Sequence, residues 1–334
     1  MAQLIAMDNG KFNVKGYIKG NEVVFKNRVS PCDSDIIPHG GYIVTHKGKK
    51  YFVGNGSDGE NAMEGKCESE NLLTTLVAIA ELTESDEEIT LVYGESANYY
   101  FNPDHHKKLK KMLTGTHTIE IFGKEKREIV IKEVLIMLEG VAHMFTDYRR
   151  RGAGTRITVD MGGTTIQVFI TTDGRPSKDE SFSFPMGMYS IRSLVDEKYK
   201  KELQIFLTKA EIDQEISKVC LRKSLQVKID RGLTLSKDEQ IDYEVSLLRD
   251  SRKIEVIEAV IREQLKELDR QLSQRKNLNL HTRDEVFFVG GTAMSIKEYI
   301  NEHYNNANVL EDGLFANVKG YYAYGMVVGK NGGK

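Results

Sequence analysis

The chain contains no tryptophan, only five prolines and only three cysteines among its 334 residues. Cys32, Cys67 and Cys220 are odd in number and far apart, which fits neither a disulfide framework nor the spacing of a zinc site. A reducing compartment, the cytoplasm, is therefore expected. No low-complexity linker is apparent in the sequence, apart from a short glycine-rich tail after Val328.

Long apolar runs and a dominant charge are also absent. No stretch of about 18 apolar residues occurs, so no membrane-spanning helix is expected. The segment Met1–Ile5 lacks the basic start and the cleavage region of a secretion signal. The formal net charge is −2, which gives no reason to expect direct contact with a membrane or sequence-specific contact with DNA. A chain of 334 residues exceeds the usual size of one hydrophobic core, so we expect two lobes.

Two common nucleotide-binding motifs are missing as well. The sequence has no G-x-x-x-x-G-K-[ST] motif, which excludes a P-loop, and no G-x-G-x-x-G after the first strand, which disfavours a dinucleotide-binding fold. Three other glycine turns are present, each after a short apolar run that reads as a buried strand. They are Asp8-Asn9-Gly10 after Leu4–Met7, Asp160-Met161-Gly162-Gly163 after Ile157–Val159, and Gly290-Gly291-Thr292 after Val286–Val289.

The strand pattern around the Asp-Gly turns occurs twice. Three strands are predicted at 3–8, 12–18 and 22–29, and three more in the same order at 155–160, 164–171 and 180–184. In the first set, Gly20-Asn21 supplies a hairpin turn. The repeat indicates an internal duplication, and hence two similar lobes.

The remaining sequence predicts a mixed α/β chain. Further strands are expected at 42–45, 50–53, 88–93, 117–122, 127–136 and 286–289. Helices are expected at 70–82, 105–113 and 140–150, from near Ser295, and over 313–328. Residues 189–280 read as mainly helical: Thr208 and Glu211 form a capping box, and the apolar spacing predicts a long amphipathic helix over 252–272.

Glycine turns of this kind can bind phosphate. Backbone N–H groups can point at an anion where no side chain blocks its approach, as at Gly10 and at Gly162-Gly163. Lys15 would add a positive charge, and Thr164 and Thr165 would add hydroxyl donors. One Asp-Gly turn alone would read as an ordinary turn. Two of them, with a Gly-Gly turn after a third apolar run, favour a site for the phosphates of a nucleotide.

The acidic residues before these turns need a different role, because a carboxylate repels phosphate. Asp8 and Asp160 are suited to hold a hydrated Mg²⁺ ion, which keeps several waters and bridges to phosphate oxygens.

These motifs resemble those of the actin/heat-shock-chaperone/sugar-kinase ATPase superfamily and, within it, the ParM-type plasmid-segregation actins and their archaeal relatives. The first phosphate element of the superfamily, D-x-G-x-x-x-x-K, matches Asp8–Lys15 throughout. Val159–Thr164 matches the second phosphate element, and Phe288–Ala293 matches the adenosine element. Glu139–Ala142 and Ala316–Gly320 match the two connecting segments. The five elements occur in the right order over nearly the whole chain.

The resemblance implies an α/β, actin-like, two-lobed ATPase fold with the nucleotide between the lobes. Each lobe would be a duplicated mixed five-stranded sheet with flanking helices. Lobe I would comprise 1–154 and 314–334, with a small subdomain at about 30–90. Lobe II would comprise 155–313, with a helical subdomain at about 189–280 and the adenosine motif at 286–294.

The resemblance also implies ATP or ADP, with GTP as an alternative, and Mg²⁺ as cofactors. The residues expected to bind them are Asp8, Gly10, Lys11, Phe12, Asn13, Lys15, Gly162, Gly163, Thr164, Thr165, Gly290, Gly291 and Thr292. Asp8 and Asp160 would hold Mg²⁺ through water. Lys11 stands where many relatives carry a hydroxyl residue, so contacts at this turn would rest on the backbone and on Asn13.

Glu139 and Asp160 are the expected catalytic residues. A carboxylate near the γ-phosphate can orient the attacking water, and the position of Glu139 in the first connecting segment implies that role. Without the resemblance, Glu139 would read as an exposed glutamate at the start of a helix.

The resemblance implies that the chain forms nucleotide-dependent head-to-tail filaments that move plasmid DNA through an adaptor protein bound to a centromere-like site. Two other functions remain open. A small-molecule kinase of the same superfamily would share the Asp-x-Gly-Gly-Thr element, but we find no convincing base for its acceptor hydroxyl. A chaperone-like switch would need an appended peptide-binding domain, for which this chain is too short.

Overall fold

The structure is a computed structural model that describes residues 2–32, 40–55, 66–146, 154–276 and 278–331. Contacts between Cα atoms divide the chain into two compact units. Unit 1 consists of Met1–Thr155, Phe169–Ser183 and Phe315–Lys334, and unit 2 consists of Arg156–Val168 and Phe184–Leu314. The lobe and subdomain boundaries given above remain predictions.

In the described part of the chain, the first sheet has nine strands, all from unit 1, in the order β3-β2-β1-β7-β9-β8-β5-β6-β4. Strand β1 pairs antiparallel with β2 and parallel with β7, and β7 pairs parallel with β9. The strands are β1 (Gln3–Asn9), β2 (Asn13–Ile18), β3 (Asn21–Lys26), β4 (Val29–Pro31), β5 (Gly41–His46), β6 (Lys49–Gly54), β7 (Ile89–Glu95), β8 (Gly115–Ile121) and β9 (Arg127–Leu138).

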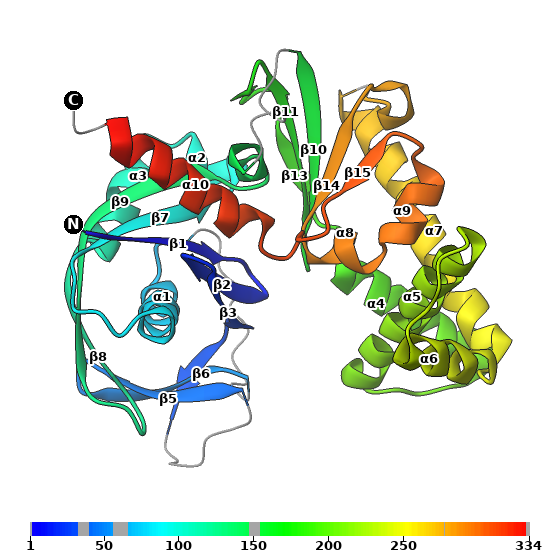
Figure 1. The fold of residues 1–334 in the computed structure, drawn as a ribbon, viewed down its shortest axis with the longest axis horizontal. Coiled ribbons are helices and arrows are strands. Elements are labelled where there is room, and N and C mark those ends of the chain that lie inside the picture. The colour runs from blue at the N-terminus through cyan, green and yellow to red at the C-terminus, as the bar shows by residue number, and fades with distance from the viewer. Residues whose placement is uncertain (1, 33–39, 56–65, 147–153, 277, 332–334) are drawn as a thin grey trace. The chain divides into compact units, whose positions relative to one another are not determined.

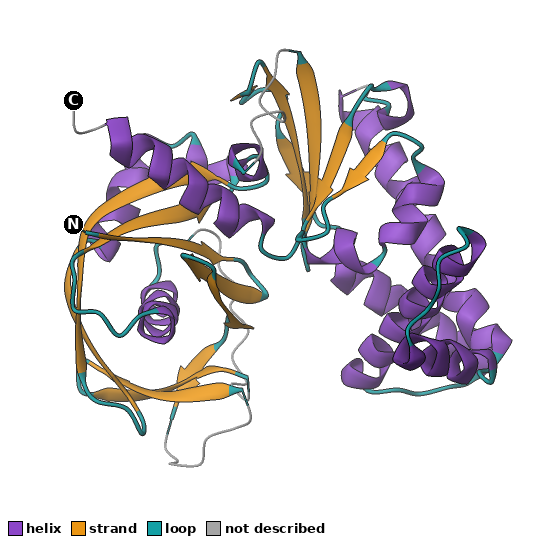
Figure 2. Cartoon of the chain, in the orientation of Figure 1, coloured by secondary structure: helices purple, strands orange, loops and turns teal. Residues whose placement is uncertain are grey.

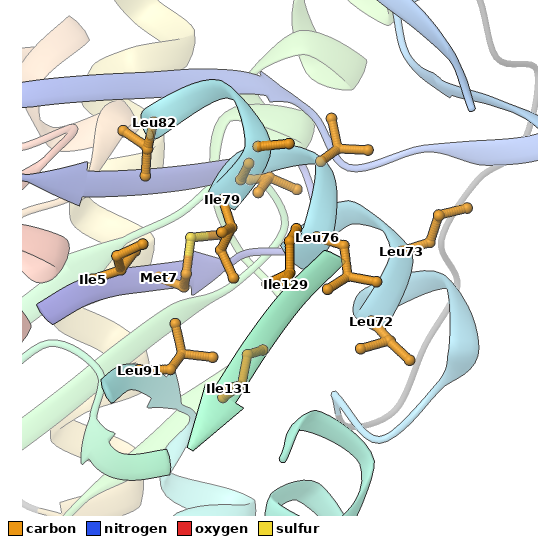
Figure 3. Packing of buried hydrophobic residues seen from close by; sticks show 14 of the residues in the cluster. Ile5, Met7, Leu72, Leu73, Leu76, Ile79, Leu82, Leu91, Ile129 and Ile131 are labelled. Carbon is orange, nitrogen blue, oxygen red and sulfur yellow. The ribbon is translucent and has the colours of Figure 1, made fainter. Parts of the chain in front are cut away.

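Helix α1 (Ser69–Leu82) lies inside the curve of this sheet (Figure 1). The sequence predicted a helix at 70–82 with one broad apolar face, but eleven of its 14 residues are buried. A helix that is apolar nearly all round is stable only when surrounded. Figure 3 shows Leu76 and Ile79 of α1 among side chains from strands β1 and β9, including Met7 and Ile129, which belong to the same buried cluster. This cluster is the core of unit 1.

Helix α10 (Ala316–Asn331) packs against β1, β7 and the 3-10 helix η1 (Ala142–Phe145). The approach to η1 is so close that a Cβ atom on Gly320 would lie 2.1 Å from the carbonyl oxygen of Ala142. The helix predicted over 140–150 is wrong for the residues that the structure describes, which form only one 3-10 turn. Two local features accompany the 3-10 turn: η1 packs against α10, and Gly140 has a positive φ of 73°. Residues 147–150 lie outside the described part.

Two further helices, α2 (Ala97–Tyr100) and α3 (Pro103–Leu113), follow β7 in unit 1. The side chain of Asn102 caps α3 by accepting hydrogen bonds from the backbone N–H groups of Asp104 and His105. Helix α3 confirms the helix predicted at 105–113, and the cap explains why it begins two residues earlier.

The second sheet has the order β12-β11-β10-β14-β15, with β13 beside β11. Its strands are β10 (Thr155–Met161), β11 (Ile166–Thr172), β12 (Arg175–Pro176), β13 (Phe182–Phe184), β14 (Val286–Val289) and β15 (Ala307–Val309). Strand β10 pairs parallel with β14, which pairs parallel with β15. The order repeats β3-β2-β1-β7-β9 of the first sheet, which confirms the predicted duplication of a mixed five-stranded sheet. Strand β15 was not predicted, because its three residues are too few to show the alternation of apolar and polar side chains that marks a strand.

Residues between the two halves of the second sheet are helical, and Figure 2 shows no strand among α4, α5, α6 and α7. The helical elements of unit 2 are α4 (Met188–Lys198), the π-helix η3 (Tyr199–Leu203), α5 (Lys209–Asp230), α6 (Lys237–Leu247), α7 (Ser251–Lys276), η4 (Leu280–Thr282), α8 (Gly291–Ser295) and α9 (Lys297–His303). The predicted capping box of Thr208 and Glu211 opens α5, and Ser236 with Glu239 forms a second one at α6. Among the described helices, none has the length and hydropathy needed to cross a bilayer.

The close packing of α10 on η1 predicts opposite effects for two substitutions in one helix. Gly320→Ala should lower the free energy of unfolding by about 1–3 kcal/mol, because the new methyl group would meet the Ala142 carbonyl. Gly329→Ala, with nothing within 4 Å of its Cβ position, should instead raise it by up to about 1 kcal/mol through helix propensity. Urea denaturation of both variants checks this, and equal effects would contradict the packing.

Candidate functional site

The first predicted phosphate turn lies at the end of strand β1 and is fixed from two sides. The side-chain amide of Asn9 is buried and donates to Asn71 O at 3.0 Å and to the hydroxyls of Thr74 and Thr75, each at 3.1 Å. The amide of Asn27 donates to Gly10 O at 2.9 Å. Asn9 and Asn27 therefore anchor the turn to α1 and to the end of β3. Neither was predicted, because asparagine in a turn carries no signal of such long-range bonds.

Four charged side chains meet beside this turn. Asp8 Oδ2 accepts from Lys15 Nζ at 3.0 Å, a contact that the antiparallel pairing of β1 with β2 permits because it places the two residues opposite each other. Lys66 Nζ lies 3.4 Å from Asp8 Oδ1 and donates to Gly94 O at 2.8 Å. Lys66 also forms a short ion pair with Glu139 Oε1. We call Asp8, Lys15, Lys66 and Glu139 the charged cluster.

Burial makes the charged cluster costly. The side chains of Asp8, Lys66 and Glu139 are 5%, 10% and 10% exposed, so each ion loses most of its hydration. A group of this kind is retained where neighbours compensate the charge, and it is common at functional sites. Within the charged cluster, Lys66 is the residue that sequence reasoning missed, because a single lysine just before α1 matches no spacing rule.

The ionisation of the charged cluster is uneven. Burial tends to raise the pKa of Asp8, but the ammonium groups of Lys15 and Lys66 outweigh it and hold that pKa below its ordinary value. Burial raises the pKa of Glu139, and the carboxylates of Asp8 and Glu95 add to this against the pull of Lys66. Burial acts to lower the pKa of Lys66, but Glu139, Asp8 and Glu95 raise it overall. The cluster thus combines a firmly ionised aspartate with a more basic glutamate.

Glu139 directly follows β9, and hydrogen bonds on both sides fix the backbone there. Its N–H donates to Glu95 O at 2.9 Å, and the N–H of Gly140 donates to Asn317 Oδ1 at 3.0 Å. The two predicted connecting segments, 139–142 and 316–320, therefore contact each other within unit 1. The reading of Glu139 as an exposed glutamate at a helix start is wrong, because the residue is only 8% exposed and no α-helix begins there.

The other predicted residues of this turn are more accessible. Lys11 is exposed, whereas Phe12 and Asn13 are half-buried. The carbonyl of Asn13 lies 3.2 Å from the position of a Cβ on Gly10, so the turn has little room for a side chain. The structure thus brings Asp8, Lys15 and Glu139 together and leaves Lys11 at the surface. Their roles in binding remain predictions.

In unit 2, the second predicted phosphate turn follows β10. The N–H of Gly162 donates to Thr165 O at 2.9 Å, so Thr164 and Thr165 lie within a tight turn. The strand predicted from 164 begins only at Ile166. The hydroxyl of Thr292 donates to Gly162 O at 2.7 Å. The predicted second phosphate element and the predicted adenosine element are therefore in contact.

Glycine permits the close approach of three backbone segments at this turn. Gly290 has a φ of 94°, and a Cβ there would lie 2.5 Å from Met161 O and 2.6 Å from Asp160 Oδ1. A Cβ on Gly187 would lie 2.5 Å from Gly162 O. Gly187 precedes α4, and the N–H of Tyr189 in its first turn donates to Gly163 O at 2.8 Å. Gly187 was not predicted, although it is as sterically restricted as Gly290.

The donor types in both units fit the expected ligands. The carboxylates of Asp8 and Asp160 are hard oxygen donors of the kind that Mg²⁺ binds, directly or through water. Lys15 offers a positive charge to a polyphosphate, and the glycine turns offer backbone without side chains. Asp160 is buried at the end of β10, in the place that corresponds to Asp8 at the end of β1.

Comparison with known proteins agrees with this geometry. Residues 6–141 match the family model described as Actin like proteins N terminal domain. The chain has the actin-like fold. The archaeal actin homolog Ta0583 superposes with a TM-score of 0.76 at 16% identity, over 97% of this chain and 99% of that one. The search of curated proteins returned no match.

Two filament structures have the same fold. The Alp12 filament subunit superposes with a TM-score of 0.68 at 18% identity, over 97% of this chain and 98% of that one. A 15-stranded ParM filament from Clostridium botulinum gives 0.66 at 17% identity, over 98% and 100%. Ta0583 in complex with ADP gives 0.73 at 16% identity, over 97% and 99%. The resemblance to ParM-type actin-like proteins is confirmed by the fold and by the N-terminal domain.

The charged cluster predicts that loss of Lys66 is more harmful than loss of a surface lysine. Lys66→Met should reduce the free energy of unfolding by about 3–5 kcal/mol, because Asp8 and Glu139 would keep buried negative charges without it. Lys124→Met, which removes the exposed ion pair with Glu81, should cost less than about 1 kcal/mol. The double variant Lys66→Met/Glu139→Gln should recover part of the loss. Chemical denaturation measures all three, and equal losses for both lysines would contradict the assignment.

Proposed function

We propose that this protein binds and hydrolyses Mg-ATP, or Mg-GTP, and couples the nucleotide cycle to assembly into filaments that segregate plasmid DNA. The observation that carries the proposal is the charged cluster. Burying two carboxylates and a lysine together adds little to the stability of a fold, because well-packed apolar side chains in their place often give equal or greater stability. Its place beside a phosphate turn supports a chemical role.

In this proposal the residues of each unit have separate tasks. Asp8 and Asp160 hold hydrated Mg²⁺, which would screen the charge of the phosphates. Lys15 and the turns at Gly10 and at 162–165 bind phosphate oxygens. Gly290-Gly291-Thr292 lies under the adenosine, as the motif implies, and Lys11, Phe12 and Asn13 line the first turn.

Glu139 is the proposed general base. Its raised pKa makes it a better proton acceptor than an ordinary surface glutamate, and a base with a pKa nearer to neutral is the more effective one at that pH. Lys66 holds the carboxylate of Glu139 in place through their ion pair. Lys66 is therefore a proposed positioning residue, and Glu139 the group that orients the attacking water.

A surface of α6 supports self-association. Ile241 and Val245 of α6, and Leu248 directly after it, recur at a helical spacing of four and three residues and are 58%, 57% and 87% exposed. We call them the α6 stripe. Ser246 is the buried residue of α6, whereas α7 buries its apolar face. An apolar stripe left in water is typical of a protein interface. Because two structural relatives were solved as filaments, we propose a second copy of this chain as the partner.

Packing within unit 2 offers a route from nucleotide to assembly. The first turn of α4 is hydrogen-bonded to Gly163 O of the phosphate turn. Helix α4 packs on α5, and α5 packs on α6. A change at the phosphate turn when the γ-phosphate leaves would therefore reach the α6 stripe through two helix contacts. This is a proposed coupling between two states of one unit. The DNA contact would be made by an adaptor protein in the cytoplasm.

Sedimentation with ATP, with ADP and without nucleotide tests the function, together with phosphate release. We expect pelleting that depends on the nucleotide. Glu139→Gln should slow hydrolysis by about 10²–10⁴-fold while binding and pelleting with ATP persist. A soluble protein whose ATP turnover rises with an added sugar or small acid would point to the kinase instead. Rapid hydrolysis by Glu139→Gln would remove Glu139 from the mechanism.

The α6 stripe predicts an assembly defect without a binding defect. Leu248→Glu and Val245→Glu should each raise the critical concentration for pelleting at least about tenfold, because the charge would have to be buried in the contact. Phe122→Glu is the matched control, since Phe122 is 50% exposed and belongs to unit 1, whereas the α6 stripe belongs to unit 2. Affinity for a fluorescent ATP analogue should stay unchanged in all three. Normal pelleting of the α6 variants would exclude this surface.

A further inference from the structure

Two histidines and an aspartate from three separate elements of unit 2 converge at one place. Asp269 lies in α7, His281 in η4, and His303 is the last residue of α9. Nε2 of His303 is 2.7 Å and Nε2 of His281 is 3.4 Å from the same carboxylate oxygen, Asp269 Oδ2. One ligand atom from each residue lies within 4.8 Å of the other two. From this arrangement we propose a site for a divalent transition-metal ion, with Zn²⁺ as the expected occupant.

The two distances between a histidine and Asp269 suit a small tetrahedral ion. With bonds of about 2.0–2.1 Å, neighbouring ligands of Zn²⁺ lie roughly 3.3 Å apart. The separation between His281 and Asp269 already has this value, and that between His303 and Asp269 needs to open by about half an ångström. Two imidazole nitrogens and one carboxylate oxygen suit Zn²⁺, Co²⁺ or Ni²⁺. Mg²⁺ prefers an octahedron of oxygens, so the nucleotide's metal would not compete.

The carboxylate of Asp269 is already oriented. Its Oδ1 accepts a hydrogen bond from the hydroxyl of Tyr304 at 2.8 Å, which leaves Oδ2 directed at both histidines. Tyr304 is itself buried, and its ring stacks on Phe288 of β14 with 5.2 Å between the centroids. The ring of His281 lies 4.8 Å from that of Tyr304. A buried partner that fixes a ligating carboxylate is a regular feature of metal sites.

The loop that carries His281 is also anchored. Asn279 caps η4 by accepting from the N–H of His281 at 3.0 Å, and Asn306 donates to Leu280 O at 2.8 Å. Leu280 is fully buried. Little of the backbone would therefore have to be ordered when the ion binds, which lowers the entropic cost of binding.

Solvent can reach the site. The side chains of His281, Asp269 and His303 are 44%, 30% and 23% exposed, so an ion can enter and a water can complete its coordination. The bound ion would join the end of α7, η4 and the end of α9. It would thereby stabilise the part of unit 2 that packs on β14 through Tyr304 and Phe288. Strand β14 leads directly to Gly290. This role of the ion is independent of the proposed ATPase activity.

A Co²⁺ titration of the tag-free, chelator-washed full chain, without nucleotide, tests the site. We expect one equivalent of Co²⁺ to produce visible d–d absorption that Zn²⁺ abolishes and excess Mg²⁺ leaves unchanged. His281→Gln and Asp269→Asn should each weaken Co²⁺ binding on the order of 100-fold or more, and Tyr304→Phe about tenfold. His46→Gln, a histidine of β5 in unit 1, is the matched control and should bind normally.

Thermal melting in the presence of a chelator shows whether each variant is folded. His281 is the most exposed of the three ligands, so its variant should melt like the parent chain without metal and should lose the rise in melting temperature that Zn²⁺ gives. Absence of stoichiometric Co²⁺ binding would overturn the proposal, and so would equal binding by His281→Gln and the parent. The three residues would then form only a hydrogen-bonded group.

Discussion

The ammonium group of Lys66, in contact with the carboxylates of Asp8 and Glu139, is the interaction on which unit 1 depends most. It joins the end of β1, the residue after β9 and the start of the segment that leads into α1. Two anions could not be buried so close together without a cation between them, because neither has water to screen it. The same group therefore holds three chain segments in place and tunes the proton affinity of Glu139.

Much of the fold could be predicted from the sequence, because its strands carry strong local signals. Apolar runs before Asp-Gly turns located β1 and β10, and their repetition indicated the duplicated sheet. The predictions that failed depended on long-range packing. Of the helix expected over 140–150, the described residues up to 146 form only a single 3-10 turn where α10 closes over Ala142, and nothing within that segment encodes the contact.

The candidate site was predictable to a similar extent. Asp8, Lys15 and Asp160 follow from short motifs, whereas Lys66 and Gly187 do not, since both become important only through segments far away in sequence. Lys66 is paired with a residue 73 positions later. Spacing rules can find residues that share one turn, but a cluster assembled from segments far apart in the sequence requires the fold first. That is also why the aspartate and two histidines of unit 2 gave no sequence signal.

The place of α10 has a consequence for synthesis of the chain. Helix α10 covers β1, although the ribosome makes β1 first and α10 only after residues 184–314 of unit 2. Until then, one apolar side of the first strand stays uncovered on the nascent polypeptide. Contacts between such distant segments form slowly, and exposed strands attract other chains in the meantime. Unit 2 can therefore fold earlier than unit 1. The N-terminal segment of unit 1, which is translated first, should need protection by chaperones for the longest time.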